Sequence, residues 1–168
     1  STRPGHQQIT EEEEIERVAP VIEAVKARFD VPVSIDSYKA KVAAAAIEAG
    51  ADLVNDIWGL KYDPEMAGLI ARTGVACCLM HNKNNTEYQD FYPDMLRETA
   101  ECVKLAKEAG IADDKIILDP GVGFGKNYEQ NLETILHMER FHELGYPMLL
   151  GTSRKSVIGL TLDLPADQ

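Results

Sequence analysis

Five short apolar segments alternate with helical segments along the chain, and this alternation constrains the fold more than any other feature. Each apolar segment has the length of a buried strand, and most of the intervening helical segments end at a glycine. Strands of this kind, joined by helices, form a parallel sheet that is covered on both faces. The sequence therefore predicts one α/β domain over residues 1–168. The expected strands are 31–35, 52–55, 75–80, 115–118 and 147–150, and the expected helices are 10–29, 39–49, 64–72, 94–109, 131–144 and 153–160.

Polar residues stand where each apolar segment ends. They are Asp36, Asn55, His81, Asp119 and the segment Gly151–Lys155. A doubly wound sheet gathers its ligand-binding residues at one switch point, whereas a barrel brings the carboxyl ends of all strands to one mouth. Capping of the next helix is the alternative for any single strand, but Asn55 and His81 lie several residues before the next helix. The pattern therefore favours a (β/α)8 TIM barrel, of which five strands are visible.

Charge and cysteine content exclude several classes of protein. The chain has 17 Lys and Arg against 28 Asp and Glu, a net charge of −11 at pH 7, so it lacks the basic surface that nucleic acid or an anionic membrane requires. Cys77, Cys78 and Cys102 are odd in number and have no CxxC spacing, which argues against a disulfide framework or a zinc site. Buried thiols in a reducing compartment fit better, and a cytoplasmic location is expected.

Two segments carry the chemistry. LDPGVGFGK, residues 118–126, has three glycines that allow a ligand close to the backbone, but neither Walker nor dinucleotide spacing. Its Asp119 ends a buried strand, so the carboxylate needs hydrogen-bond donors, which either a ligand or a structural turn would supply. GTSRKS, residues 151–156, places two cations and hydroxyl groups at the start of a helix, where an anion is favoured. A helix cap with exposed cations is the alternative there.

Taken together, these segments resemble the dihydropteroate synthases. The matching pieces, in the order and spacing of that family, are STRPG at the start, VSIDSYKA around Asp36, LVNDIWG around Asn55, MHN at 80–82, ILDPGVGFGK around Asp119 and LLGTSRKS around Lys155. The resemblance implies a TIM barrel that condenses hydroxymethyl-dihydropterin diphosphate with p-aminobenzoate and releases diphosphate, a step of folate biosynthesis. It also implies that sulfonamides compete with p-aminobenzoate.

The resemblance further implies which residues form the site. Asp119 is expected to accept hydrogen bonds from the pterin ring and its amino group, and Lys155 to donate to its carbonyl. Met80 is expected as an apolar floor, although it fits an ordinary core position equally well. The implied catalytic residues are Asp36, Asp119 and Lys155, the pterin contacts are Asp36, Asn55, Met80, Asp119, Gly151 and Lys155, the p-aminobenzoate contacts are Phe124, Arg154 and Ser156, and the diphosphate contacts are Thr2 and Arg3.

Other residues have less specific expectations. Lys126 is expected among the cations at the mouth of the barrel, together with Arg3, Arg154 and Lys155. His81 fits a general base and a structural polar residue about equally. The aromatic residues expected to serve packing are Trp58, Tyr88, Phe91 and Tyr92.

Measured against the family, the chain is expected to hold barrel strands three to seven and to lack the first two and the last. The resemblance implies Mg²⁺ as cofactor, with its ligand in the absent first strand and no metal ligand in this chain. It implies small-molecule substrates, a homodimer, and no nucleic-acid or membrane partner. Unpaired strand edges predict that the segment alone is not a stable catalyst. The alternatives are another pterin-binding barrel, such as a methyltetrahydrofolate methyltransferase, which has no need of GTSRKS, and a non-catalytic pterin- or anion-binding fragment.

Overall fold

Four parallel strands form the centre of the structure, a computed structural model that describes residues 8–165. They are β1 (Ser34–Asp36), β2 (Leu53–Asp56), β3 (Ala76–Met80) and β4 (Ile116–Asp119), and they lie in the order β1-β2-β3-β4. Strands that follow one another in the sequence are therefore neighbours in the sheet. Between residues 8 and 165 the sheet has no switch point of the doubly wound kind. The predicted parallel α/β architecture is confirmed.

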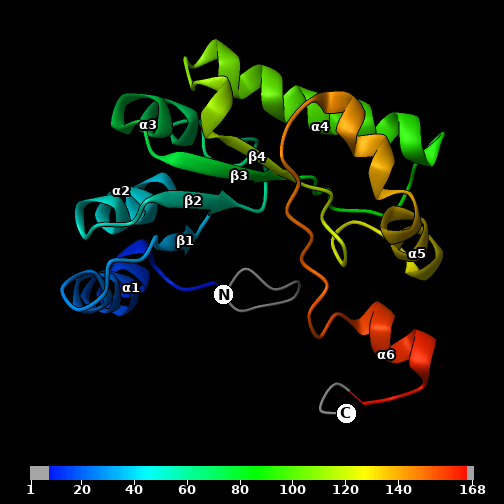
Figure 1. Cartoon of the computed structure of the whole chain (residues 1–168), viewed down its shortest axis with the longest axis horizontal. Coiled ribbons are helices and arrows are strands. Elements are labelled where there is room, and N and C mark those ends of the chain that lie inside the picture. The colour runs from blue at the N-terminus through cyan, green and yellow to red at the C-terminus, as the bar shows by residue number, and fades with distance from the viewer. Residues whose placement is uncertain (1–7, 166–168) are drawn as a thin grey trace.

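Helices join the strands and cover one side of the sheet (Figure 1). The first four follow one another around that side, each in contact with the next, whereas α5 and α6 contact each other beyond the end of β4. The helices are α1 (Glu11–Lys26), α2 (Ala40–Glu48), α3 (Met66–Thr73), α4 (Phe91–Glu108), α5 (Tyr128–Leu136) and α6 (Ser156–Leu162), with 3-10 segments at Asp113–Lys115 and Met138–Leu144. Among the described residues, no helix has both the length and the apolar character needed to cross a membrane.

The main core lies between the sheet and these helices. Ile35, Val54, Cys77 and Ile116 stand opposite one another in neighbouring strands, and all four are buried in that core. Since side chains alternate along a strand, the next residue of each strand points to the opposite face of the sheet. Helix α2 supplies small side chains to the core, such as Ala43, which lets it pack closely on the strands.

Residues 147–150 do not form the fifth strand that the sequence predicts. Only Met148 pairs with β4, through one parallel bridge to Leu118. Two backbone hydrogen bonds flank it, from Leu118 N–H to Pro147 O at 2.9 Å and from Leu149 N–H to Leu118 O at 2.8 Å. Pro147 has no N–H to extend the ladder. The segment therefore runs beside β4 without the regular pairing of a strand.

The helix predicted at 131–144 is divided in two. Its first part, α5, begins earlier, at Tyr128, because Asn127 and Gln130 form a capping box there. His137, with φ −118° and ψ 36°, ends α5, and a 3-10 segment follows. That segment buries Phe141 in an aromatic cluster, so tertiary packing overrides the helical pattern.

Candidate functional site

The face of the sheet opposite the main core carries polar side chains. Asp36, Asn55 and Cys78 stand opposite one another, and Met80 stands opposite Asp119 two residues further along the strands. Because side chains alternate, these five residues share one face, at the carboxyl ends of the strands. Four residues that the sequence predicts for a single site therefore lie side by side.

The side chain of Asn55 carries a buried acceptor. Its side-chain Oδ1 is buried and has no hydrogen-bond partner among the residues that the structure describes. Buried polar atoms are almost always paired, and an unpaired one costs about 1–3 kcal/mol. This cost fits a site in which a ligand supplies the missing donor.

Asp119 is a buried carboxylate at the end of β4, with 7% of its surface exposed. Its Oδ1 accepts a hydrogen bond from the Gly121 N–H at 2.7 Å. Burial raises the pKa of the Asp119 carboxyl, while that hydrogen bond and the charges of Lys155 and Lys126 act to lower it. A Cβ added to Gly151 would lie 3.8 Å from Oδ2, so the second oxygen lies beside that glycine. The turn at Gly121 therefore engages Oδ1, while Oδ2 faces Gly151.

Glycines of the glycine-rich loop, residues 120–126, permit close approaches to other parts of the chain, and those at Gly121 and Gly123 lie nearest the candidate site. A Cβ on Gly121, whose φ is +70°, would lie 2.0 Å from the His81 carbonyl oxygen, so only glycine fits. A Cβ on Gly123 would lie 3.1 Å from Cδ of Lys155, whose side chain passes over this glycine. The Lys155 Nζ lies 4.3 Å from the centre of the Phe124 ring, a cation–π contact. The loop thus brings Phe124 and Lys155 together beside the polar face.

Met80 belongs to a small apolar cluster, separate from the main core. Tyr38 and Ile57 are buried with it, and Trp58 and Phe124 pack against it. Trp58 does serve packing, as the sequence predicts, but it packs next to the candidate site. Sequence reasoning did not select Tyr38 or Ile57. The available signal was position, because each follows within two residues of a predicted site residue, Asp36 or Asn55.

Arg154 and Ser156 lie at the start of α6. Together with Lys155 they line a cavity of about 460 Å³ whose other walls come from residues 158–165. Neither Phe124 nor Asp119 belongs to this lining, so Lys155 is the link between the cavity and the polar face. The two predicted diphosphate contacts, Thr2 and Arg3, lie outside the described residues.

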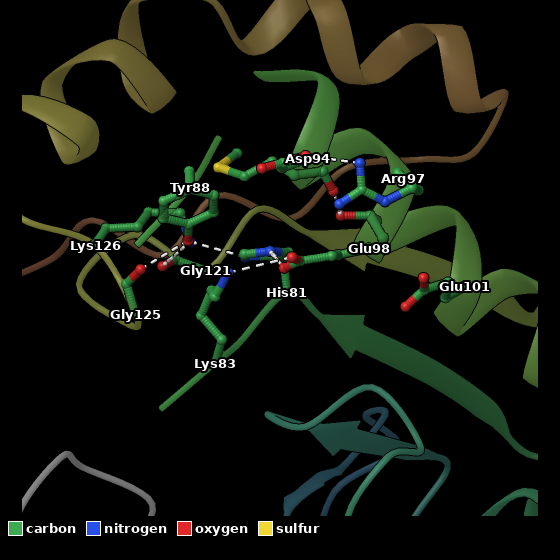
Figure 2. Close-up of polar contacts among 12 residues, drawn as sticks. His81, Lys83, Tyr88, Asp94, Arg97, Glu98, Glu101, Gly121, Gly125 and Lys126 are labelled. Atoms are coloured by element: carbon green, nitrogen blue, oxygen red, sulfur yellow. Dashed lines mark hydrogen bonds and ion pairs between the residues drawn. The ribbon is translucent and has the colours of Figure 1, made fainter. Parts of the chain in front are cut away.

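A buried polar cluster beneath the glycine-rich loop was not predicted. Figure 2 shows His81 between Glu98 of α4 and Lys126, with Nε2 2.8 Å from Glu98 Oε2 and Nδ1 3.1 Å from Lys126 Nζ. Burial lowers the pKa of His81 to about 2 and that of Lys126 to about 7. The prediction that Lys126 is a cation at the mouth is wrong, because its side chain turns inward and only 8% of the residue is exposed. Both ring nitrogens of His81 are engaged in this cluster.

The described residues do not fit a metal site. Nowhere in residues 8–165 do three His, Cys, Asp or Glu side chains come together in a group able to hold a metal ion. The carboxylate of Asp119 faces a backbone N–H and two lysines instead.

Sequence comparison finds that the chain is similar to curated dihydropteroate synthases. The chain is 61% identical over 168 residues to a dihydropteroate synthase of Clostridium beijerinckii and 51% identical to one of Bacillus subtilis; the matches cover the whole chain but 62% and 59% of those proteins. The chain thus spans about three-fifths of the length of these relatives.

Solved structures agree with the sequence relatives. A dihydropteroate synthase of Clostridium difficile, determined in the presence of pteroic acid, superposes with a TM-score of 0.97 at 45% identity, covering 99% of this chain and 64% of that one. One from Xanthomonas albilineans, with 4-aminobenzoic acid, gives 0.92 at 38% identity, covering 97% of this chain and 60% of that one. The pterin binding enzyme family matches residues 1–168, the whole chain. This chain belongs to the pterin binding enzyme family.

Proposed function

We propose that the protein carrying this chain is a dihydropteroate synthase, which joins hydroxymethyl-dihydropterin diphosphate to p-aminobenzoate and releases diphosphate. The observation that carries the proposal is the Oδ1 of Asn55, buried and without a partner among residues 8–165, on a sheet face shared with Asp36 and Asp119. The names of the curated relatives support a synthase over a methyltransferase.

The polar face suits the edge of a pterin ring, which presents hydrogen-bond donors and acceptors side by side. Asp119 accepts from the ring N–H and the amino group, and Asn55 Oδ1 pairs with a further donor. Asp36 and Gly151 complete the edge, and Lys155 donates to the pterin carbonyl. Buried polar groups of this kind reject analogues that leave them unpaired.

The reaction asks the protein to position two substrates and to stabilise charge. Loss of diphosphate leaves a carbocation on the pterin methylene carbon. The amine of p-aminobenzoate attacks this carbon, and the nitrogen then releases a proton. Phe124 packs on the aminobenzoate ring, and Arg154 and Ser156 bind its carboxylate, where sulfonamides compete. Thr2 and Arg3 bind the diphosphate.

The four strands and the segment 147–150 are, in this proposal, strands three to seven of a (β/α)8 barrel whose mouth holds the site. The sequential order of β1 to β4 supports this arrangement, because adjacent barrel strands follow the chain. A homodimer, a cytoplasmic location and a need for Mg²⁺ stay predictions.

The test is a condensation assay on the whole protein that contains these residues, with pterin diphosphate, Mg²⁺ and labelled p-aminobenzoate. Labelled dihydropteroate supports the proposal, and its absence contradicts it. Asp119→Asn keeps the size and the contact with Gly121 but turns an acceptor into a donor. We expect it to weaken pterin binding by about 2 kcal/mol or more, roughly thirtyfold. Unchanged affinity would contradict the role given to Asp119.

A further inference from the structure

One buried lysine holds the loop that carries Phe124. The Lys126 Nζ donates to the carbonyl oxygens of Gly121 and Phe124, each at 3.0 Å. It also contacts His81 Nδ1 at 3.1 Å (Figure 2). These three acceptors use all three N–H bonds of an ammonium group. The ammonium therefore closes the glycine-rich loop on itself and ties it to the residue that follows β3.

His81 extends this anchor to helix α4. Its Nε2 faces the carboxylate of Glu98, which only accepts, so the ring hydrogen is on Nε2 and Nδ1 accepts from the protonated amine of Lys126. Nε2 then donates to Glu98 Oε2 at 2.8 Å. Glu98 Oε1 in turn accepts a hydrogen bond from Lys83 Nζ at 3.2 Å. A neutral imidazole thus connects a carboxylate on α4 to the buried ammonium of Lys126.

Two further contacts join the loop after β3 to the loop after β4. The Tyr88 hydroxyl donates to the Gly125 carbonyl oxygen at 2.7 Å. A Cβ on Gly125 would lie 2.8 Å from the Lys83 carbonyl oxygen, so the two backbones touch there. The loop is therefore held at Gly125 by the loop after β3, and at Gly121 and Phe124 by Lys126.

Lys126 also acts on Asp119 through its charge. Burial raises the pKa of the Asp119 carboxyl, and the positive charges of Lys126 and Lys155 oppose that rise. Loss of the Lys126 charge therefore makes Asp119 easier to protonate, and a protonated carboxyl accepts hydrogen bonds from a ligand less well. The titratable and charged groups that face this pair are Asp36, Cys78, His81, Lys83, Glu98 and Lys155.

We propose that Lys126 is a positioning residue for the reaction: fixed by His81 and Glu98, it holds the glycine-rich loop in place and supplies positive charge to the carboxylate of Asp119. This inference rests on the proposed function. It differs from a purely structural role, because loss of the charge must move the pH dependence of pterin binding as well as weaken it.

The test measures the Kd for pteroic acid by calorimetry across pH 5 to 9, in the whole protein that contains these residues. Lys126→Met keeps the side-chain stem and removes the ammonium. We expect affinity at neutral pH to fall about tenfold or more, and the acidic limb of the binding profile to move to higher pH. Lys104→Met removes an exposed cation from α4 and should keep the wild-type profile.

A matched pair at His81 covers the case in which Lys126→Met fails to fold. His81→Asn keeps an acceptor near the position of Nδ1, whereas His81→Gln keeps a donor near the position of Nε2. The proposal expects the Asn variant to bind closer to wild type than the Gln variant, with the smaller displacement of the acidic limb. If the two His81 variants have the same pH profile of binding, the inference is overturned while the proposed function stands. The same holds if Lys126→Met keeps the acidic limb of the wild type. Absence of binding by the wild type overturns the proposed function and this inference with it.

Discussion

At the scale of single residues, the atoms that surround a glycine decide whether a larger residue can replace it. Gly121 and Gly74 have nearly the same left-handed backbone, with φ of +70° and +69°. Their surroundings differ, since a Cβ at position 121 would meet the His81 carbonyl oxygen, whereas one at position 74 would meet no atom within 4 Å. The pair separates the effect of a close approach from the effect of backbone conformation.

Replacing Gly121 with Ala should therefore lower the free energy of unfolding by about 3 kcal/mol or more. A left-handed Ala costs roughly 1–2 kcal/mol, and the overlap with a backbone oxygen adds about 1–3 kcal/mol. Gly74→Ala carries the first cost alone. Urea unfolding of both variants measures the difference, and equal losses would show that the loop does not press against His81.

His81 should make the protein sensitive to acid. Its pKa in the folded state is about 2, against 6.5 for the unfolded chain. The unfolded state therefore binds more protons between these values, and stability falls as the pH drops below 6.5. At pH 5 the loss attributable to this residue is about 2 kcal/mol. Urea unfolding at pH 7 and pH 5 should show a smaller loss for His81→Asn than for wild type, and an equal loss would contradict the assignment.

At the scale of elements, the sequence predicted β2 and β4 to within about one residue, because buried parallel strands form nearly continuous apolar runs. It also predicted that Asp36, Asn55 and Asp119 lie together, because each ends or nearly ends such a strand. The division of the helix at His137 was not predictable, because it depends on where tertiary packing places Phe141.

The polar cluster around Lys126 was not predictable from the sequence either, because it also depends on tertiary packing. Its partners His81 and Glu98 come from a different loop and from α4, and no local pattern links them to a lysine that follows glycines. The charge of Lys126 suggested an exposed position at the mouth. Only the tertiary fold shows three acceptors that together satisfy a buried ammonium.

Helix α5 begins at a capping box. Asn127 and Gln130 exchange hydrogen bonds in a capping box directly after the glycine-rich loop. Asn127→Ala removes one acceptor and should lower the free energy of unfolding by about 1 kcal/mol. Asn127→Ser keeps a capping oxygen and should lose a few tenths at most. Guanidinium unfolding compares the two, and an equal loss would show that the cap does not contribute.

At the scale of the whole molecule, apolar surface gathers near the carboxyl-terminal part of the described chain. Leu136, Leu160 and Leu162 are 69%, 67% and 59% exposed, and they lie on α5 and α6. Within residues 8–165, β1 pairs with β2 on one side only. Exposed leucines and an open strand edge both favour association with other chains.

Residues 1–168 produced alone should therefore self-associate. Sedimentation velocity should show species heavier than the 18.6 kDa chain, and Leu160→Glu should reduce them, because it places a charge on the apolar surface. Glu129→Gln changes a charge in the first turn of α5, at the other end of that helix from Leu136, and serves as a control for altered charge. A soluble monomer of the wild-type segment that unfolds cooperatively would contradict this prediction.

Trp58, the one tryptophan of the chain, packs against the cluster of Met80, Tyr38 and Ile57 that borders the polar face. Phe124, in contact with Lys155, packs against the same cluster. We expect a ligand that reaches Asp119 to change the polarity and the ring contacts around this indole. The intrinsic fluorescence of Trp58 is therefore an optical probe of ligand binding that needs no added label.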